Sequence, residues 1–84
     1  MSLGSDLAAA REASGQTLDD IAERTRVRRT VIERIEADDF SLCGGDVYAR
    51  GHIRNIAVVV GVDPVPLVAE FDRCWPEVSA PARF

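Results

Sequence analysis

The segment at residues 16–36, QTLDDIAERTRVRRTVIERIE, constrains the fold of this chain most, because two helical patterns follow one another with almost no connection between them. In each pattern, apolar residues recur every three or four positions, which is typical of a helix that buries one face. The polar break at Thr25 and Arg26 leaves room only for a tight turn. We therefore expect two short helices, the first packed across the second, with one face of the second left bare. The apolar side chains that set the two patterns are Leu18, Ile21, Ala22, Val27, Val31, Ile32 and Ile35.

The bare face of the second helix is polar and rich in arginine. Residues 24–34 contain five arginines and a single acid, so this stretch carries a charge of +4, whereas the whole chain carries −4. Salt screens charges beyond about 8–10 Å, so the local value matters more for docking than the total. A rigid helix with an exposed basic face indicates a binding module. The residues expected on this face are Arg28, Arg29, Thr30, Glu33 and Arg34.

Length and composition limit the classes of function that the chain can serve. Its 84 residues allow one domain with one core. A chain of this size buries roughly 60–65% of its extended surface on folding, which leaves little room for a deep substrate pocket. Apolar residues make up 46% and charged residues 29%, a balance typical of globular rather than disordered chains. The net negative charge argues mildly against indiscriminate binding to nucleic acid.

The cysteines and the apolar stretches predict a soluble chain in the cytoplasm. Cys43 and Cys74 belong to no CxxC pair, so no zinc or redox motif follows, and we expect both as small core residues in a reducing compartment. The polar and charged start of the chain does not resemble a signal peptide. The longest apolar stretch, residues 56–62, is far shorter than the ~20 residues that span a bilayer.

Helix start and stop signals in the first half predict three helices. The first should cover residues 3–14, with Gly15 in a left-handed cap behind it. The second opens at Thr17, whose spacing to Asp20 resembles a capping box. The third should run from residue 28 or 29 to residue 37.

The second half predicts a return of the chain to the core and two further helices. Phe40 and Leu42 should turn inward after the third helix. The fourth helix should cover residues 46–60 and end at Gly61. Its β-branched end would also fit a strand, but the helical spacing of the preceding apolar residues favours a helix. The fifth helix should begin behind Asp63, because an aspartate followed by proline is typical of a helix start.

These elements predict an all-α domain of five helices over residues 1–75. The Pro- and Ala-rich residues 76–84 have no period and indicate a tail or linker. Phe71 and Trp75 should clamp the fifth helix onto the core, because aromatic side chains dominate burial in small domains.

Two sets of residues carry a resemblance to known families. The first resembles the helix-turn-helix of the Cro/repressor type, although Arg26 stands where the turn usually has glycine; its residues are Ala22, Val27, Ile32, Ile35 and Glu36. The second is similar to the N-terminal cytoplasmic domain of RodZ-family proteins and includes the YARG sequence. Together they cover residues 3 to about 74. The second set consists of Asp39-Phe40, residues 47–51, Ile53-Arg54 and residues 61–64.

The RodZ resemblance implies a place and a partner. It implies the cytoplasmic head of a bitopic protein, followed by a linker, one transmembrane helix and an extracytoplasmic part, so that membrane contact would come through a segment outside this sequence. Family members bind the bacterial actin homologue MreB, chiefly through the fourth helix, and help to set cell shape. This chain keeps Tyr48 but has His52 and Ile56 where the family typically has exposed aromatics. Another envelope protein is the alternative partner.

The basic face of the third helix has two interpretations. In a DNA-binding regulator, its arginines would read bases and hold phosphates in the major groove, while Gln16 and Thr17 would contact phosphate at the start of the second helix. The alternative is a solvated face on which Arg29 and Glu33 form an ordinary ion pair.

The fourth helix is the candidate protein-docking element. Its candidate contacts are Tyr48, His52, Asn55 and Ile56. The alternative is that Tyr48 is a half-buried core aromatic and that Arg50 is a surface charge, or a partner of Asp38 or Asp39.

No catalytic, metal or cofactor site is expected. His52 is the single histidine, and a metal site needs several ligands at set spacing. The paired carboxylates at residues 19–20 and 38–39 fall at helix ends, where capping explains them. Gly44, Gly45 and Gly51 do not form a phosphate-binding loop. We therefore expect a non-catalytic binding module of RodZ type in envelope or cell-shape organisation, with a sequence-specific DNA-binding regulator as the alternative.

Overall fold

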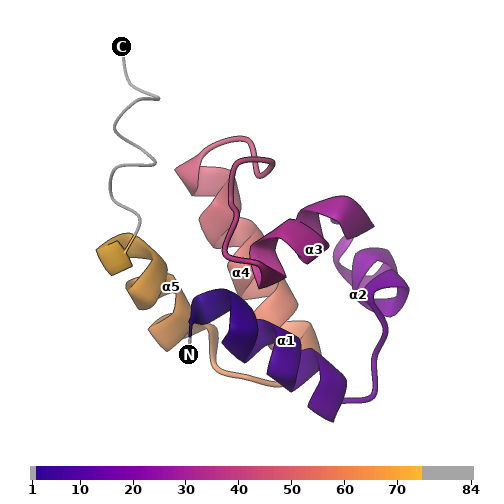
Figure 1. The fold of residues 1–84 in the computed structure, drawn as a ribbon. Coiled ribbons are helices and arrows are strands. Elements are labelled where there is room, and N and C mark those ends of the chain that lie inside the picture. The colour runs from indigo at the N-terminus through magenta and orange to yellow at the C-terminus, as the bar shows by residue number, and fades with distance from the viewer. Residues whose placement is uncertain (1, 75–84) are drawn as a thin grey trace.

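The structure is a computed structural model that describes residues 2–74, and within them it contains five helices and no strand (Figure 1). The prediction of an all-α fold is therefore confirmed. Trp75 and the predicted tail lie outside the described residues. No helix in residues 2–74 is long and apolar enough to cross a membrane. The helices are α1 (Leu3–Ala13), α2 (Leu18–Thr25), α3 (Arg29–Glu36), α4 (Asp46–Val60) and α5 (Pro64–Cys74).

Local capping chemistry sets the first helix boundaries. The Thr17 hydroxyl accepts a hydrogen bond from the Asp20 backbone N–H at 3.0 Å, and the Asp20 carboxylate accepts one from the Thr17 N–H at 3.0 Å. The predicted capping box is therefore present and satisfies two N–H groups that have no partner inside α2. Ser2 and Ser5 form the same reciprocal cap on α1. Gly15 has φ of +76°, as expected for the residue that ends the turn after α1.

The turn between α2 and α3 is built without glycine. Arg26 has φ of +62° and its N–H donates to the Ala22 carbonyl at 2.9 Å, so an arginine occupies the left-handed position that glycine usually fills. Left-handed geometry costs a non-glycine residue roughly 1–2 kcal/mol. Thr25 steadies the turn, because its hydroxyl donates to the Ile21 carbonyl at 2.7 Å and accepts from the Val27 N–H at 3.2 Å.

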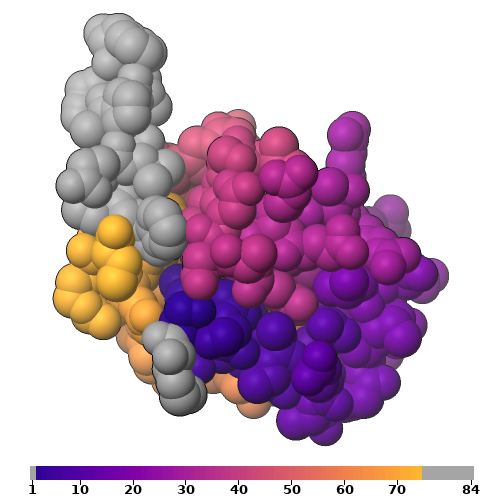
Figure 2. Space-filling view, in the orientation of Figure 1, coloured from indigo at the N-terminus to yellow at the C-terminus, as the bar shows by residue number. Residues whose placement is uncertain are grey.

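The core lies around α4, which packs against α1, α2 and α5. The buried residues of α4 recur every three or four positions, and Gly61 closes the helix with φ of +86°, so the helical prediction for residues 56–60 is confirmed. In the space-filling view, α1 lies between α5 and α3 (Figure 2). The fully buried large side chains are Leu3, Leu7, Ile21, Ile32, Ile35, Ile53, Ile56 and Phe71.

The α3–α4 connection differs from expectation at one residue. Phe40 is buried, with its ring edge-on to Phe71 at a centroid distance of 5.1 Å, and Cys43 is buried nearby in sequence. Leu42 was expected in the core but is 47% exposed. The Cys43 N–H donates to the Phe40 carbonyl at 3.2 Å, which closes a tight turn. That turn directs the residues at its two ends, Phe40 and Cys43, inward and leaves the two between them, Ser41 and Leu42, outside.

The cysteines separate into one buried and one exposed thiol. Cys43 belongs to the core, as predicted, and desolvation followed by the nearby charge of Asp39 raises the pKa of its thiol to about 11. Cys74 is exposed at the end of α5, so its assignment to the core is wrong. Phe71, one turn earlier, takes the inward position on this helix.

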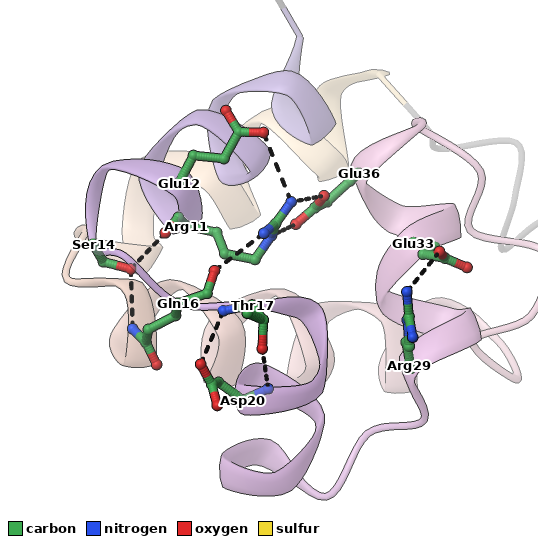
Figure 3. A network of polar contacts seen from close by, with 9 residues as sticks. All are labelled: Arg11, Glu12, Ser14, Gln16, Thr17, Asp20, Arg29, Glu33 and Glu36. Carbon is green, nitrogen blue, oxygen red and sulfur yellow. Dashed lines mark hydrogen bonds and ion pairs between the residues drawn. The ribbon is translucent and has the colours of Figure 1, made fainter.

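Polar contacts tie α1 to the carboxyl end of α3. Arg11 donates to Glu36 from Nε at 2.7 Å and from Nη2 at 3.1 Å, and its Nη1 donates to the Gln16 carbonyl at 3.1 Å (Figure 3). Asp38 accepts from the Gly4 N–H at 2.8 Å and so caps α1 from outside. One arginine therefore joins α1, the α1–α2 loop and α3.

Candidate docking surfaces

The face of α3 is exposed as predicted, but two of its three arginines are paired with acids. Arg29 lies 3.5 Å from Asp19 and 3.9 Å from Glu33, the i,i+4 pair expected from the sequence (Figure 3). Arg34 lies 3.1 Å from Asp39. These pairs hold part of the positive charge against the protein's own surface. The exposed side chains on this face are Arg28, Arg29, Thr30, Glu33 and Arg34.

The two residues expected to hold phosphate at the start of α2 are engaged within the fold. The side-chain amide of Gln16 donates to the Val59 carbonyl at 3.0 Å and to the Ser14 hydroxyl at 3.1 Å. Its amide oxygen is buried, with no hydrogen-bond partner in the part of the chain that the structure describes. The Thr17 hydroxyl already serves as the helix cap. The structure therefore gives both side chains a structural role.

Acids surround the start of α2. Asp19 and Asp20 are exposed in its first turn. Hydrogen bonds from Thr17 hold the pKa of Asp20 below its usual value, so this carboxylate is ionised at neutral pH. A phosphate approaching α2 from this end meets negative charge.

The least neutralised positive charge lies at the α2–α3 turn. Arg24, Arg26 and Arg28 are exposed. Within residues 2–74, neither Arg26 nor Arg28 takes part in an ion pair or a side-chain hydrogen bond. The sequence marked the basic stretch that contains these arginines, but only Arg28 was a candidate site residue. Arg26 has an acid three residues before it, Glu23, but it lies in the turn behind α2 and forms no ion pair with that acid, so no local pattern in the sequence identifies it.

The first turns of α4 present apolar side chains to solvent. Tyr48 is 64% exposed, so it is not a half-buried core aromatic. Its ring lies next to Gly44, where an added Cβ would be 3.7 Å from the ring carbon Cδ2. Val47 and Leu42 are also exposed, although sequence reasoning did not select them. We call Leu42, Val47 and Tyr48 the 42–48 surface. Their signal is the period of α4 itself, because Val47 and Tyr48 fall outside the face defined by its buried residues.

The remaining candidates on α4 divide by burial. Asn55 is exposed and remains available for contact. His52 is half-buried, and desolvation lowers the pKa of its imidazole, which favours the neutral ring. Ile56 is 1% exposed, and its selection as a partner contact is wrong. The reason is its position one turn after Ile53, on the face of α4 that packs against the other helices.

Arg50 joins α4 to α5 rather than to the end of α3. Its Nε donates to Asp72 at 2.6 Å, its Nη1 donates to Asp46 at 3.2 Å, and the guanidinium carbon lies 5.9 Å from the centre of the Phe71 ring. The suggested pairing with Asp38 or Asp39 is therefore wrong. The approach of α5 to α4 decides the partner, and no local pattern in the sequence specifies that approach.

Beyond these helix faces, the described residues form a shallow groove. No group of three or more His, Cys, Asp or Glu side chains in residues 2–74 could hold a metal ion. A shallow groove of about 270 Å³ runs between α4 and α5, with an apolar floor from α5 and Arg54 and Asp72 among its lining residues. The arrangement is that of a small helical binding domain.

Comparison with known families agrees with that class. The family model for the helix-turn-helix domain matches residues 6–67, which is well over half of the chain and extends from α1 into α5. The chain belongs to this family of helix-turn-helix domains. No curated protein and no solved structure matches it. Such a domain is typically a non-enzymatic module that binds DNA or protein.

Proposed function

We propose that this chain is the cytoplasmic head of a RodZ-like, membrane-anchored protein and docks a protein partner of the cell-shape or envelope machinery through the 42–48 surface. The observation that carries the proposal is the exposure of Leu42, Val47 and Tyr48 within one short stretch. Solvent-exposed aromatic side chains are enriched at protein interfaces and are often their energetic centres. The fold gains nothing from the exposure of a tyrosine and two aliphatic residues.

The electrostatics of the helix-turn-helix support a protein partner over DNA. Arg29 and Arg34 are paired with acids, and Gln16 is engaged with Val59. The ionised Asp20 stands at the end of α2 from which a phosphate would be held. Fewer free arginines mean fewer phosphates neutralised, and affinity for DNA depends on that number.

The resemblance to RodZ proteins supports a bacterial actin homologue as the partner. This chain lacks the family aromatics at His52 and Ile56, and Ile56 is buried. The docking contacts available to it are Tyr48 with Val47 and Leu42, together with the exposed amide of Asn55. We therefore place the centre of the contact on the first turns of α4.

The test is co-sedimentation of the 84-residue chain with filaments of a purified bacterial actin homologue. Tyr48→Ala should weaken binding about tenfold or more, because truncating an interfacial tyrosine commonly removes over ~1.4 kcal/mol. Thr30→Ala, an exposed change on α3, is the matched control and should bind like the parent. Failure of the parent chain to bind, or backbone NMR shifts confined to α2 and α3, contradicts the proposal.

A second candidate function is DNA binding, favoured by one observation. Arg26 and Arg28 are exposed at the α2–α3 turn and have no acidic partner within the described part of the chain, and Arg24 lies beside them in sequence. If these arginines hold phosphates, duplex DNA should bind at ~50 mM salt and lose affinity steeply as salt rises. Arg28→Ala should then reduce the steepness of that salt dependence. No binding at ~50 mM salt rejects this candidate.

A further inference from the structure

Gly51 lies in the middle of α4, at a position where the fold does not require glycine. It does not have positive φ, and a Cβ added at this position would meet no atom within 4 Å. Glycine in a helix interior is less stable than alanine, because it loses more backbone freedom on folding. A glycine that the fold does not need leaves an open place where another backbone can approach α4 closely.

Gly51 belongs to an outward stripe of α4. Val47, Gly51, Arg54 and Val58 recur at intervals of three and four residues, so they share one side of the helix. Val58 is 63% exposed and Val47 is also exposed. None of the four belongs to the core. The stripe therefore forms an unpartnered, mainly apolar ridge with a notch at the glycine.

The stripe borders the groove between α4 and α5. Arg54 belongs to both, and α5 supplies the floor with Val65, which is 71% exposed, and the half-buried Val68. At about 270 Å³ the groove lies below the ~300–1,000 Å³ of typical small-molecule pockets. The groove follows α5 from Pro64 to Asp72 and meets α4 at Arg54. A groove along one helix suits a third helix, because side chains of one helix pack into the grooves of another.

The charges of this face are uneven. Asp72 is held by Arg50 at 2.6 Å, and Asp46, the other acid on Arg50, lies in the first turn of α4, where the helix N-terminus favours negative charge. Arg54 makes no ion pair or side-chain hydrogen bond with any residue that the structure describes. An occupant of the groove thus gains from a carboxylate placed opposite Arg54.

We propose that this α4–α5 face, formed by Gly51, Arg54, Val58, Val65 and Val68, is a second docking surface that accepts an amphipathic helix of a partner protein with an acidic residue opposite Arg54. The glycine admits the backbone of the partner helix, the valines bury its apolar stripe, and Arg54 selects its charge. Of the 42–48 surface, Val47 borders this face on the same stripe, whereas Tyr48, the centre of that surface, lies around α4 from it, so the chain can join two partners.

The test uses synthetic amphipathic helical peptides of about five turns, with a leucine stripe and either glutamate or lysine at the centre. The isotope-labelled 84-residue chain should show NMR shifts centred on Gly51, Arg54 and Val65 with the glutamate peptide. The lysine peptide should bind about tenfold more weakly, and a peptide with a central proline should not bind. Equal affinity for the two charges, or shifts elsewhere on the surface, overturns the proposal.

Two substitutions separate docking from folding. The glutamine side chain of Gly51→Gln fits the open space, so this variant should keep or raise Tm. It should reduce the affinity for the glutamate peptide at least tenfold. Ala9→Gln, at an exposed position of α1 outside both docking surfaces, is the matched control and should bind normally. Arg54→Glu should reverse the preference toward the lysine peptide. Unchanged affinity in Gly51→Gln contradicts close helix approach.

The test of the α4–α5 face does not depend on the proposed function of the 42–48 surface. Tyr48→Ala should leave peptide binding unchanged, and Gly51→Gln should leave actin-homologue binding unchanged, so that either proposal can fail alone. Sedimentation of the chain without peptide tests a second copy as the occupant. If the chain forms a concentration-dependent dimer and Gly51→Gln abolishes it, the proposal of an acidic partner helix is rejected. The face would then serve self-association.

Discussion

Gly4 shows how one residue fixes the distance between two helices. A Cβ added there would lie 2.5 Å from the Ile35 carbonyl oxygen and 2.6 Å from that of Glu36, both of them backbone atoms. The Gly4 N–H also donates to Asp38 at 2.8 Å. Only a residue without a side chain allows α1 to meet the carboxyl end of α3 this closely.

We predict that Gly4→Ala lowers the free energy of unfolding by about 1–3 kcal/mol, the usual cost of forcing an extra methyl group into a packed contact. Gly51→Ala is the control with the opposite sign, because its methyl group meets open space and alanine favours the helix by about 0.5–1 kcal/mol. Urea unfolding followed by circular dichroism measures both changes. An unchanged or raised midpoint in Gly4→Ala would show that the α1–α3 contact relaxes freely.

The two cysteines make a second prediction at the scale of the residue. Cys43 is buried and its pKa is raised to about 11, whereas Cys74 is exposed. The thiolate is the reactive form, so an alkylating reagent at pH 8 should modify Cys74 and reach Cys43 only after unfolding. Because folding favours the neutral Cys43 thiol, stability should fall as pH rises from about 9 toward 11. Mass spectrometry of the alkylated chain, with and without urea, checks the order. Equal modification of both thiols in the native chain contradicts it.

At the scale of the element, α1 and α3 depend on one mostly buried ion pair. Arg11 and Glu36 lie 2.7 Å apart, with 14% and 12% of their side chains exposed, and bonding to Glu36 raises the pKa of Arg11. Removing one partner of such a pair leaves the other charge desolvated and uncompensated. We predict that Glu36→Gln costs about 2–4 kcal/mol of stability, below the upper range for full burial.

The control for Glu36→Gln is Glu33→Gln, which removes one of the two exposed ion pairs of Arg29 on the other side of α3. Exposed pairs contribute roughly 0.2–1 kcal/mol, so this variant should unfold close to the parent. Thermal or urea unfolding of the two variants, measured side by side, compares their losses of stability. A similar small effect of both substitutions would mean that water solvates Arg11 when Glu36 is removed.

The elements also show what a single sequence specifies. Thr17, Asp20 and Gly61 carry local capping chemistry, and the predicted helix ends at these residues agree with the structure. The rotation of a helix about its axis depends on neighbours that are distant in sequence. Ile56 faces inward and Tyr48 outward for that reason, and Arg50 finds Asp72 because α5 lies beside α4. Exposure of the α3 face was predictable, because its arginines are charged and lie on the side of the helix opposite its apolar residues.

At the scale of the whole molecule, α5 secures the domain through a single aromatic side chain. Phe71 is fully buried, contacts the edge of Phe40, and carries the Arg50 guanidinium over its ring. A domain of this length has a free energy of unfolding of about 4–13 kcal/mol, from ~0.05–0.15 kcal/mol per residue. The loss of one such anchor is therefore comparable with the whole stability of the fold.

We predict that Phe71→Ala destabilises the domain by about 3–5 kcal/mol, because it removes apolar burial, leaves a cavity beside Phe40 and removes the ring beneath the Arg50 guanidinium. Phe71→Leu keeps most of the volume and should lose roughly a third as much. Since α4 packs on α1, α2 and α5, the loss should unfold all five helices together. Circular dichroism and the backbone NMR signals of α5 should then give coincident urea transitions. Separate transitions would mean that α5 detaches while the helix-turn-helix stays folded, and the α4–α5 groove could then open without unfolding the rest of the domain.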